Sequence, residues 1–279
     1  MFFEGFGFKK FIFVKTMIGG HDMFQEEFQE VCKAGVNKSN FLRKNPLGYF
    51  LSSVLAGGLI ALGGFVAFTA GSIISVGEVA SFTKIVQAIV FASALSLIVM
   101  AGAELFTGNN FVMASTALRK QVNWSKVVKL WVVCWSGNLI GSVLFAVLFQ
   151  ISGVPKGDVG TYFANLAQTK MAYQPLELFV RAMLCNMLVC LATWCSIKMK
   201  SESGKLIMVF WCIIIFMICG FEHSVANMSV LAVGLMNATN QAVSIGGYVY
   251  NVITVSLGNL VGSVLFVAIP YHFISKEVK

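Results

Sequence analysis

Long apolar stretches without charge constrain the fold of this chain more than any other feature. A helix needs about 20 apolar residues to cross the hydrocarbon core of a bilayer. Residues 45–77, 85–103 and 130–155 approach or exceed this length without a single Asp, Glu, Lys or Arg. Only 11% of the residues are charged, against about 25% in soluble domains. The sequence therefore predicts an all-α protein that crosses a membrane several times.

Hydropathy predicts six membrane-spanning segments separated by short polar loops. They are expected at residues 47–74, 85–118, 127–151, 176–197, 206–236 and 245–271. These spans divide the chain into an N-terminal tail of residues 1–44, a transmembrane domain of residues 45–272 and a C-terminal tail of residues 273–279.

The N-terminal tail has two distinctive parts. Residues 23–36 have the spacing of an amphipathic helix, with Phe24, Phe28 and Val31 on one face and three glutamates on the other. This helix is expected either at the membrane surface or packed on the transmembrane domain. Residues 1–22 interleave phenylalanine with lysine, and we interpret them either as an interfacial anchor or as an extension upstream of a chain that works from Met23.

The distribution of Lys and Arg predicts the orientation in the membrane. These residues concentrate in the two tails and in the second-to-third and fourth-to-fifth loops, whereas the other three loops hold only Lys84, Lys156 and Lys170. By the positive-inside rule both termini are cytoplasmic, and we expect a bacterial-type plasma (inner) membrane protein. The net charge of +8 is then an orientation signal, and no nucleic acid partner is expected.

A nine-residue sequence occurs twice. Gly-Asn-Leu-Ile-Gly-Ser-Val-Leu-Phe at 137–145 recurs at 258–266 with Val in place of Ile. Both copies contain Gly-x-x-x-Gly, which lets helix backbones approach closely. The copies fall in the third and sixth predicted spans, so each half contains three spans and the second half runs inverted relative to the first. This is the inverted-repeat plan of many channels and transporters.

Polar residues interrupt the second and fifth predicted spans at matching places. Each interruption has a glutamate, Glu104 or Glu222, followed five residues later by an asparagine. Ionisable groups at such depth cost about 2.5–3.5 kcal/mol and usually mark function. We expect helices 2 and 5 to be broken here, with half-helix N-termini that favour an anion. Glu104 and Glu222 are predicted to be structural, accepting hydrogen bonds from backbone amides freed at the breaks, whereas His223 is predicted to be functional.

Three of these segments resemble the hallmark segments of the formate/nitrite transporter family. They are Glu-Leu-Phe-Thr-Gly at 104–108, Cys-Asn-Met-Leu-Val-Cys-Leu-Ala at 185–192 and Gly-Phe-Glu-His-Ser-Val-Ala-Asn-Met at 220–228. Asn45-Pro-Leu-Gly and both Gly-Asn-Leu copies also fit, so the resemblance runs from about residue 23 to the end. It implies a homopentamer with an aquaporin-like fold and one pore per subunit, a selective channel or transporter for small monovalent anions.

The resemblance also implies a role for individual residues. The family's loop threonine falls on Thr107, its central histidine on His223, the polar neighbours on Asn186 and Asn227, and the outer vestibule lysine on Lys170. The apolar constrictions fall on Phe91 and Phe216 on the outer side and on Leu95, Leu105 and Val189 on the inner side, with Phe106 as the loop phenylalanine.

The first of these motifs bears on the substrate. Glu-Leu-Phe-Thr-Gly looks closer to the nitrite and hydrosulfide branches than to the formate branch, which typically has Asp-Leu-Phe-Thr-Ser. We therefore rank hydrosulfide first, nitrite second and formate third. All three anions have neutral conjugate acids, so His223 is expected to donate a proton or a hydrogen bond as the anion passes the apolar constrictions.

Other functions fit the sequence less well. A water or glycerol channel of the same architecture would place Asn-Pro-Ala at both half-helix starts, but Asn45-Pro46 precedes the first span. A membrane enzyme would need haem or metal ligands, and His21, His223 and His272 lie too far apart in membrane depth to form one site. A purely structural scaffold would not explain two matched polar breaks. We therefore expect no enzymatic activity, no cofactor and no bound metal.

Overall fold

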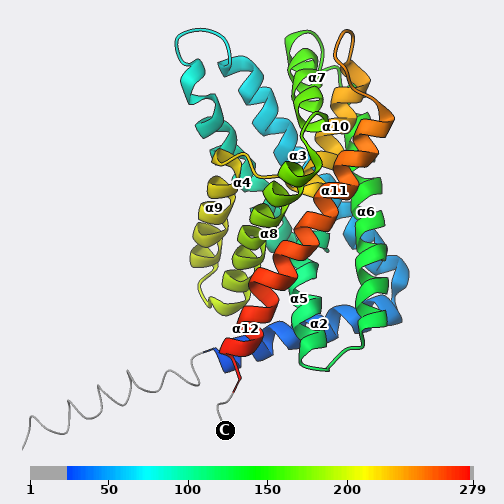
Figure 1. Ribbon diagram of the computed structural model, residues 1–279, viewed down its shortest axis with the longest axis vertical. Helices are drawn as coiled ribbons and strands as arrows, with labels where there is room; N and C mark the ends of the chain where they lie inside the picture. The colour runs from blue at the N-terminus through cyan, green and yellow to red at the C-terminus, as the bar shows by residue number, and fades with distance from the viewer. Residues whose placement is uncertain (1–23, 277–279) are drawn as a thin grey trace, which may run out of the picture.

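The computed structural model describes residues 24–276, and every regular element in this range is helical (Figure 1). The predictions for residues 1–22 thus lie outside the described residues. The elements in chain order are α2 (Gln25–Lys44), α3 (Pro46–Ile74), η1 (Ala80–Phe82), α4 (Thr83–Ala101), α5 (Phe106–Leu118), α6 (Trp124–Ile151), α7 (Asp158–Met171), α8 (Pro175–Lys198), α9 (Glu202–Ile218), α10 (Ser224–Asn237), α11 (Ile245–Ser263), the π-helical η2 (Val264–Ala268) and α12 (Ile269–Ile274).

Most of these helices have the length and apolarity of membrane spans. Within the described residues, five helical stretches qualify: α3, η1 with α4, α6, α8, and the continuous run from α11 to α12. Large apolar side chains such as Leu47, Val132 and Ile253 point outward and are 45–65% exposed. A protein in water would expose fewer of them, whereas lipid tails cover them without cost. The predicted all-helical membrane class is therefore confirmed.

Two of the six predicted spans correspond to pairs of shorter helices. Residues 85–118 form α4 and α5, separated by residues 102–105, and residues 206–236 form α9 and α10, separated by residues 219–223. Gly102 and Gly220 adopt left-handed backbone conformations, with φ of +64° and +70°. Glycine is favoured there because a Cβ atom would strain this conformation. Each glycine turns the chain out of the preceding helix and into the non-helical junction.

Two features differ from the sequence predictions. Helix α2 continues to Lys44, well beyond the predicted end at residue 36. Its apolar face packs on α5, where Gly35 lies against Thr116. Of the two expected placements, the structure therefore has the one in which this helix packs on the other helices. Residues 158–171, which lie in a predicted loop between spans, form the helix α7. The division into tails and transmembrane domain stays a prediction.

The repeated nonapeptides hold α6 on α3 and α11 on α8. A Cβ atom on Gly141 would overlap the backbone oxygen of Val54 in α3, and one on Gly262 would overlap that of Met183 in α8. The glycines therefore permit backbone contact between helices, as predicted from Gly-x-x-x-Gly. Figure 1 shows α11 lying along α8 in this way.

Candidate functional site

The two non-helical junctions bring the N-termini of α5 and α10 together. From this meeting point α5 runs toward the end of the bundle where α2 lies, and α10 runs toward the opposite end (Figure 1). Thr107 Oγ1, in the first turn of α5, lies 2.9 Å from His223 Nε2, at the N-cap of α10. Both side chains are buried. The positive ends of two helix dipoles thus converge on one buried polar pair.

The hydrogen bonds of His223 indicate which ring nitrogen carries the proton. Its Nδ1 accepts the backbone N–H of Ala226 at 3.1 Å, so a neutral imidazole holds its proton on Nε2. Nε2–H then points at the Thr107 hydroxyl. The ring is stacked against Phe216, with centroids 6.2 Å apart and an interplanar angle of 14°. One nitrogen therefore caps a helix while the other presents a donor beside Thr107.

One asparagine ties the first junction to its surroundings. Asn138 accepts the N–H of Phe106, the first residue of α5, at 2.8 Å. Its amide group donates to the backbone oxygens of Ser53 at 2.7 Å and Glu104 at 3.0 Å. Asn138 thus satisfies two backbone groups at the interruption, the N–H of Phe106 and the oxygen of Glu104, and ties them to Ser53 within the continuous helix α3.

A second asparagine repeats this arrangement at the other junction. Asn259 accepts the N–H of Ser224 at 2.9 Å and donates to the backbone oxygens of Ala182 at 2.8 Å and Glu222 at 2.9 Å. Asn138 and Asn259 are the second residues of the two repeated nonapeptides. Sequence reasoning assigned the repeats to glycine packing and missed the asparagines, although their identity in both copies was the available signal.

Each junction glutamate is buried and forms an ion pair with a partly buried lysine. Lys38 Nζ donates to both carboxylate oxygens of Glu104 at 2.8 Å, and the side-chain amide of Asn109 donates to one of them at 2.8 Å. Glu222 is held in the same way by Lys170, at 2.7 Å to both oxygens, and by Asn227 at 2.6 Å. The carboxylates therefore have lysine and asparagine partners in place of the predicted backbone amides.

The partner of Glu104 was not predicted. Lys38 lies in α2, the helix before α3, which is the first span of the first half. Lys170 lies in α7, the helix before α8, which is the first span of the second half. That parallel position was the sequence signal for Lys38. Lys170 itself, expected as a vestibule cation, is only 13% exposed and neutralised by Glu222.

Replacing Lys170 by methionine should destabilise the protein by about 3 kcal/mol, because it leaves the buried carboxylate of Glu222 without a counter-charge. The double variant Lys170→Met/Glu222→Gln removes both charges and keeps an acceptor for Asn227, so it should recover most of this loss. Thermal unfolding of the purified protein in detergent measures both. Equal destabilisation by the single and double variants would contradict the ion-pair interpretation.

Apolar side chains flank the Thr107–His223 pair. Phe91 and Phe216 meet edge to face with ring centroids 6.0 Å apart. On the side toward α2, Leu95 and Leu105 line a cavity of about 320 Å³. Its wall also includes Lys38, Lys205 and the ion-pair partner of Lys205, Glu202. The two remaining apolar candidates, Val189 and Phe106, are buried in the same core cluster.

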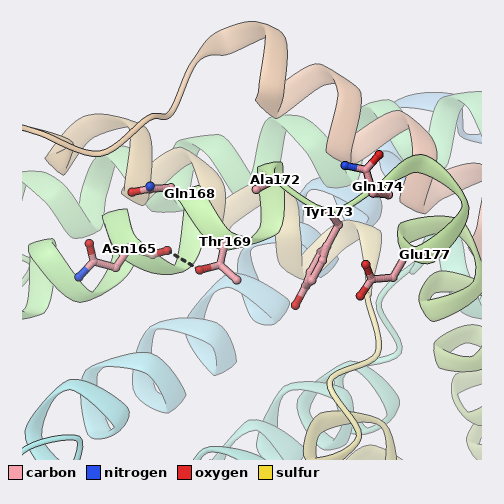
Figure 2. A pocket seen from close by; sticks show the side chains of 7 residues that line it. All are labelled: Asn165, Gln168, Thr169, Ala172, Tyr173, Gln174 and Glu177. Carbon is pink, nitrogen blue, oxygen red and sulfur yellow. Dashed lines mark hydrogen bonds between the residues drawn. The ribbon is translucent and has the colours of Figure 1, made fainter.

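A second depression, of about 560 Å³, lies where α7 ends and α8 begins. Figure 2 shows the Tyr173 ring between Thr169 and Glu177. Amide, hydroxyl and carboxylate side chains line it, and none of the lining residues is cationic. The guanidinium of Arg181 lies 4.5 Å from the centre of the Tyr173 ring and pairs with Glu177. This depression therefore has no charge of its own that would hold an anion.

The five predicted pathway residues form two connected groups. Thr107 and His223 bond directly, and Asn186 donates to the backbone oxygen of Thr107 at 3.3 Å. Asn227 and Lys170 instead share Glu222, which precedes His223 in the chain. Asn186 also donates to the backbone oxygen of Asn259 at 2.8 Å, so it links the start of α5 to α11.

Comparisons with known proteins identify the family and the fold. The model of the formate/nitrite transporter family matches residues 25–273. The nitrite transporter NirC of Escherichia coli is 30% identical over 90% of this chain and 92% of its own length. A solved FNT family ion channel superimposes with a TM-score of 0.84 at 30% identity, covering 90% of this chain and 99% of the channel.

A pentameric formate channel with formate bound superimposes with a TM-score of 0.69 at 26% identity, covering 81% of this chain and 96% of that channel. The family match spans both junctions, both repeated nonapeptides and all of the candidate site residues. This chain, a multi-pass membrane protein, belongs to the formate/nitrite transporter family.

Proposed function

We propose that this protein is a selective channel or transporter for small monovalent weak-acid anions. The observation that carries the proposal is the buried Thr107–His223 pair, held between two helix N-termini and flanked by apolar side chains. Helix N-termini favour negative charge, and a histidine can supply a proton or a hydrogen bond near neutral pH. A relative named as a nitrite transporter and a structural relative named as a formate channel support this class of substrate.

The proposed architecture is six spans arranged as two inverted three-helix repeats, aquaporin-like, with broken spans formed by α4 with α5 and by α9 with α10. The matched bond sets of Asn138 and Asn259 support it, as do the matched ion pairs of Glu104 and Glu222. The pentameric structural relative supports a homopentamer with one pore per subunit. The basic loops support cytoplasmic termini in a bacterial-type plasma membrane.

The proposed pathway runs along the axis of each subunit. From the cytoplasmic side an anion enters the cavity lined by Lys38 and Lys205 and passes an inner constriction of Leu95, Leu105 and Val189. It reaches Thr107 and His223, and then the outer constriction of Phe91 and Phe216. Phe106, whose amide is held by Asn138, fixes the start of α5 at the inner constriction.

The chemical step follows from the cost of desolvation. A bare anion in an apolar constriction loses several kcal/mol of hydration. In its neutral form, His223 Nε2–H can donate to the anion in place of Thr107, and the hydroxyl of Thr107 can then donate as well. Proton transfer requires the imidazolium form of His223: a proton taken up from the aqueous side would pass from the ring to hydrosulfide, nitrite or formate, which would leave as its neutral acid while His223 returns to the neutral form. Asn186 holds the backbone of Thr107, and Asn227 holds Glu222 next to His223.

Hydrosulfide remains first among the candidate substrates on the Glu104–Gly108 motif, and the NirC relative supports nitrite. The family assignment gives no support to the alternative of a water or glycerol channel. Flux into proteoliposomes of hydrosulfide, nitrite, formate and chloride tests the proposal. We expect one of the weak-acid anions to cross at least about tenfold faster than chloride. Chloride is the anion of a strong acid, so it has no neutral form near pH 7. Equal flux of all four, or water flux alone, would overturn the proposal.

A further inference from the structure

A basic groove lies where α2 ends and α6 begins. It has a volume of about 300 Å³, and its wall includes Arg43 from the end of α2 and Lys126 and Lys129 from the first turns of α6. Ser39 and Asn40 add polar side chains that can donate hydrogen bonds. No acidic residue lines the groove.

The three cations of this groove have no acidic partner. Among residues 24–276, the ion pairs use Lys33, Lys38, Lys170, Arg181 and Lys205, and none involves Arg43, Lys126 or Lys129. The first turn of α6 also carries no acid and no side-chain cap, so its helix dipole adds positive potential. The groove therefore concentrates positive charge without internal compensation.

Exposed apolar side chains follow on α3 and α6, two helices that begin beside the groove and pack on each other. Pro46 lines the groove, and beyond it Leu51 on α3 is 55% exposed and Val132 on α6 is 58% exposed. Trp124, at the start of α6, is 46% exposed, as is typical of aromatic residues at the membrane–water interface. A ligand that fits this surface is anionic at one end and apolar over the rest of its length.

We propose that the groove formed by Arg43, Lys126 and Lys129 binds the phosphate headgroup of an anionic phospholipid, whose acyl chains lie on the exposed apolar side chains of α3 and α6. Basic pockets at the cytoplasmic ends of membrane helices bind such headgroups. The adjoining apolar surface favours a lipid over a soluble phosphate, which would gain nothing from it. The proposed orientation places this site in the cytoplasmic leaflet.

Native mass spectrometry of the purified, full-length assembly tests the proposal with phosphatidylglycerol and phosphatidylcholine of identical acyl chains. Phosphatidylglycerol should bind the wild type more tightly. The variant Arg43→Gln/Lys126→Gln/Lys129→Gln should bind it about tenfold or more weakly, because each basic residue near the surface contributes to the attraction, and its binding of phosphatidylcholine should not change. The matched control Lys120→Gln/Lys200→Gln/Lys276→Gln removes the same charge outside the groove and should keep the wild-type affinity.

Three outcomes would overturn the proposal: unchanged affinity in the groove variant, an equal loss in the control, or displacement of the lipid by millimolar inorganic phosphate. If the triple variant fails to fold, Lys129→Gln measured against Lys200→Gln decides the question, with weaker lipid binding expected only for the first. Lipid binding is measured without anion flux, so this result is independent of the proposed transport function.

Discussion

Replacing His223 by alanine should lower the flux of the transported anion in proteoliposomes by at least about a hundredfold, the scale on which a positioned proton donor contributes. The imidazole places one donor, Nε2–H, beside Thr107 at the meeting point of two helix N-termini. Without that donor, the anion meets the apolar constrictions with no hydrogen bond or proton to offset its lost hydration. Initial rates of anion entry, measured across a pH gradient, give the size of the effect.

The matched variant His223→Asn separates transport from helix capping. Asparagine is a good N-cap residue and can replace Nδ1 as the acceptor for the N–H of Ala226, but it has no group at the position of Nε2. We expect His223→Asn to keep the thermal stability of the wild type and to lose flux as fully as alanine does. Wild-type flux in His223→Asn would exclude the donor role, whatever happens in the alanine variant.

Replacing Asn259 by leucine should destabilise the protein by roughly 4 kcal/mol or more. The side chain satisfies the N–H of Ser224 and the backbone oxygens of Ala182 and Glu222. Ala182 lies inside the continuous helix α8, so leucine leaves two groups without a partner, the Ser224 N–H and the Glu222 oxygen. Each such buried group costs about 1–3 kcal/mol, and Asn259 is fully buried. Thermal unfolding in detergent, followed by circular dichroism, measures the loss.

Two further variants make this prediction specific. Asn138→Leu removes the equivalent bonds at the first junction and should destabilise by a similar amount. Asn37→Leu, at an exposed position of α2, should change stability by less than about 0.5 kcal/mol, as is usual for surface substitutions. A small effect of both buried substitutions would mean that the junctions are held by something other than the two asparagines.

The sequence by itself determined the features that depend on the solvent around the helices. A bilayer admits only segments that satisfy their own backbone hydrogen bonds, so the uncharged runs identified the helical class and most helix positions. The costly polar interruptions located the junctions, and the repeated nonapeptides located the close contacts of α6 with α3 and α11 with α8. The motif resemblance identified the family and named the candidate residues, including Thr107 and His223.

Only the tertiary structure decided which groups pair with one another. From the sequence, Lys38 was a charge of the N-terminal tail and Lys170 an expected vestibule cation. Both lie far along the chain from Glu104 and Glu222, and only the packing of α2 and α7 brings each within 2.8 Å of its glutamate. Composition likewise could not assign the bonds of Asn138 and Asn259. A hydrogen bond or ion pair depends on positions to within a few tenths of an ångström, whereas a hydropathy pattern records only which side of a helix is polar.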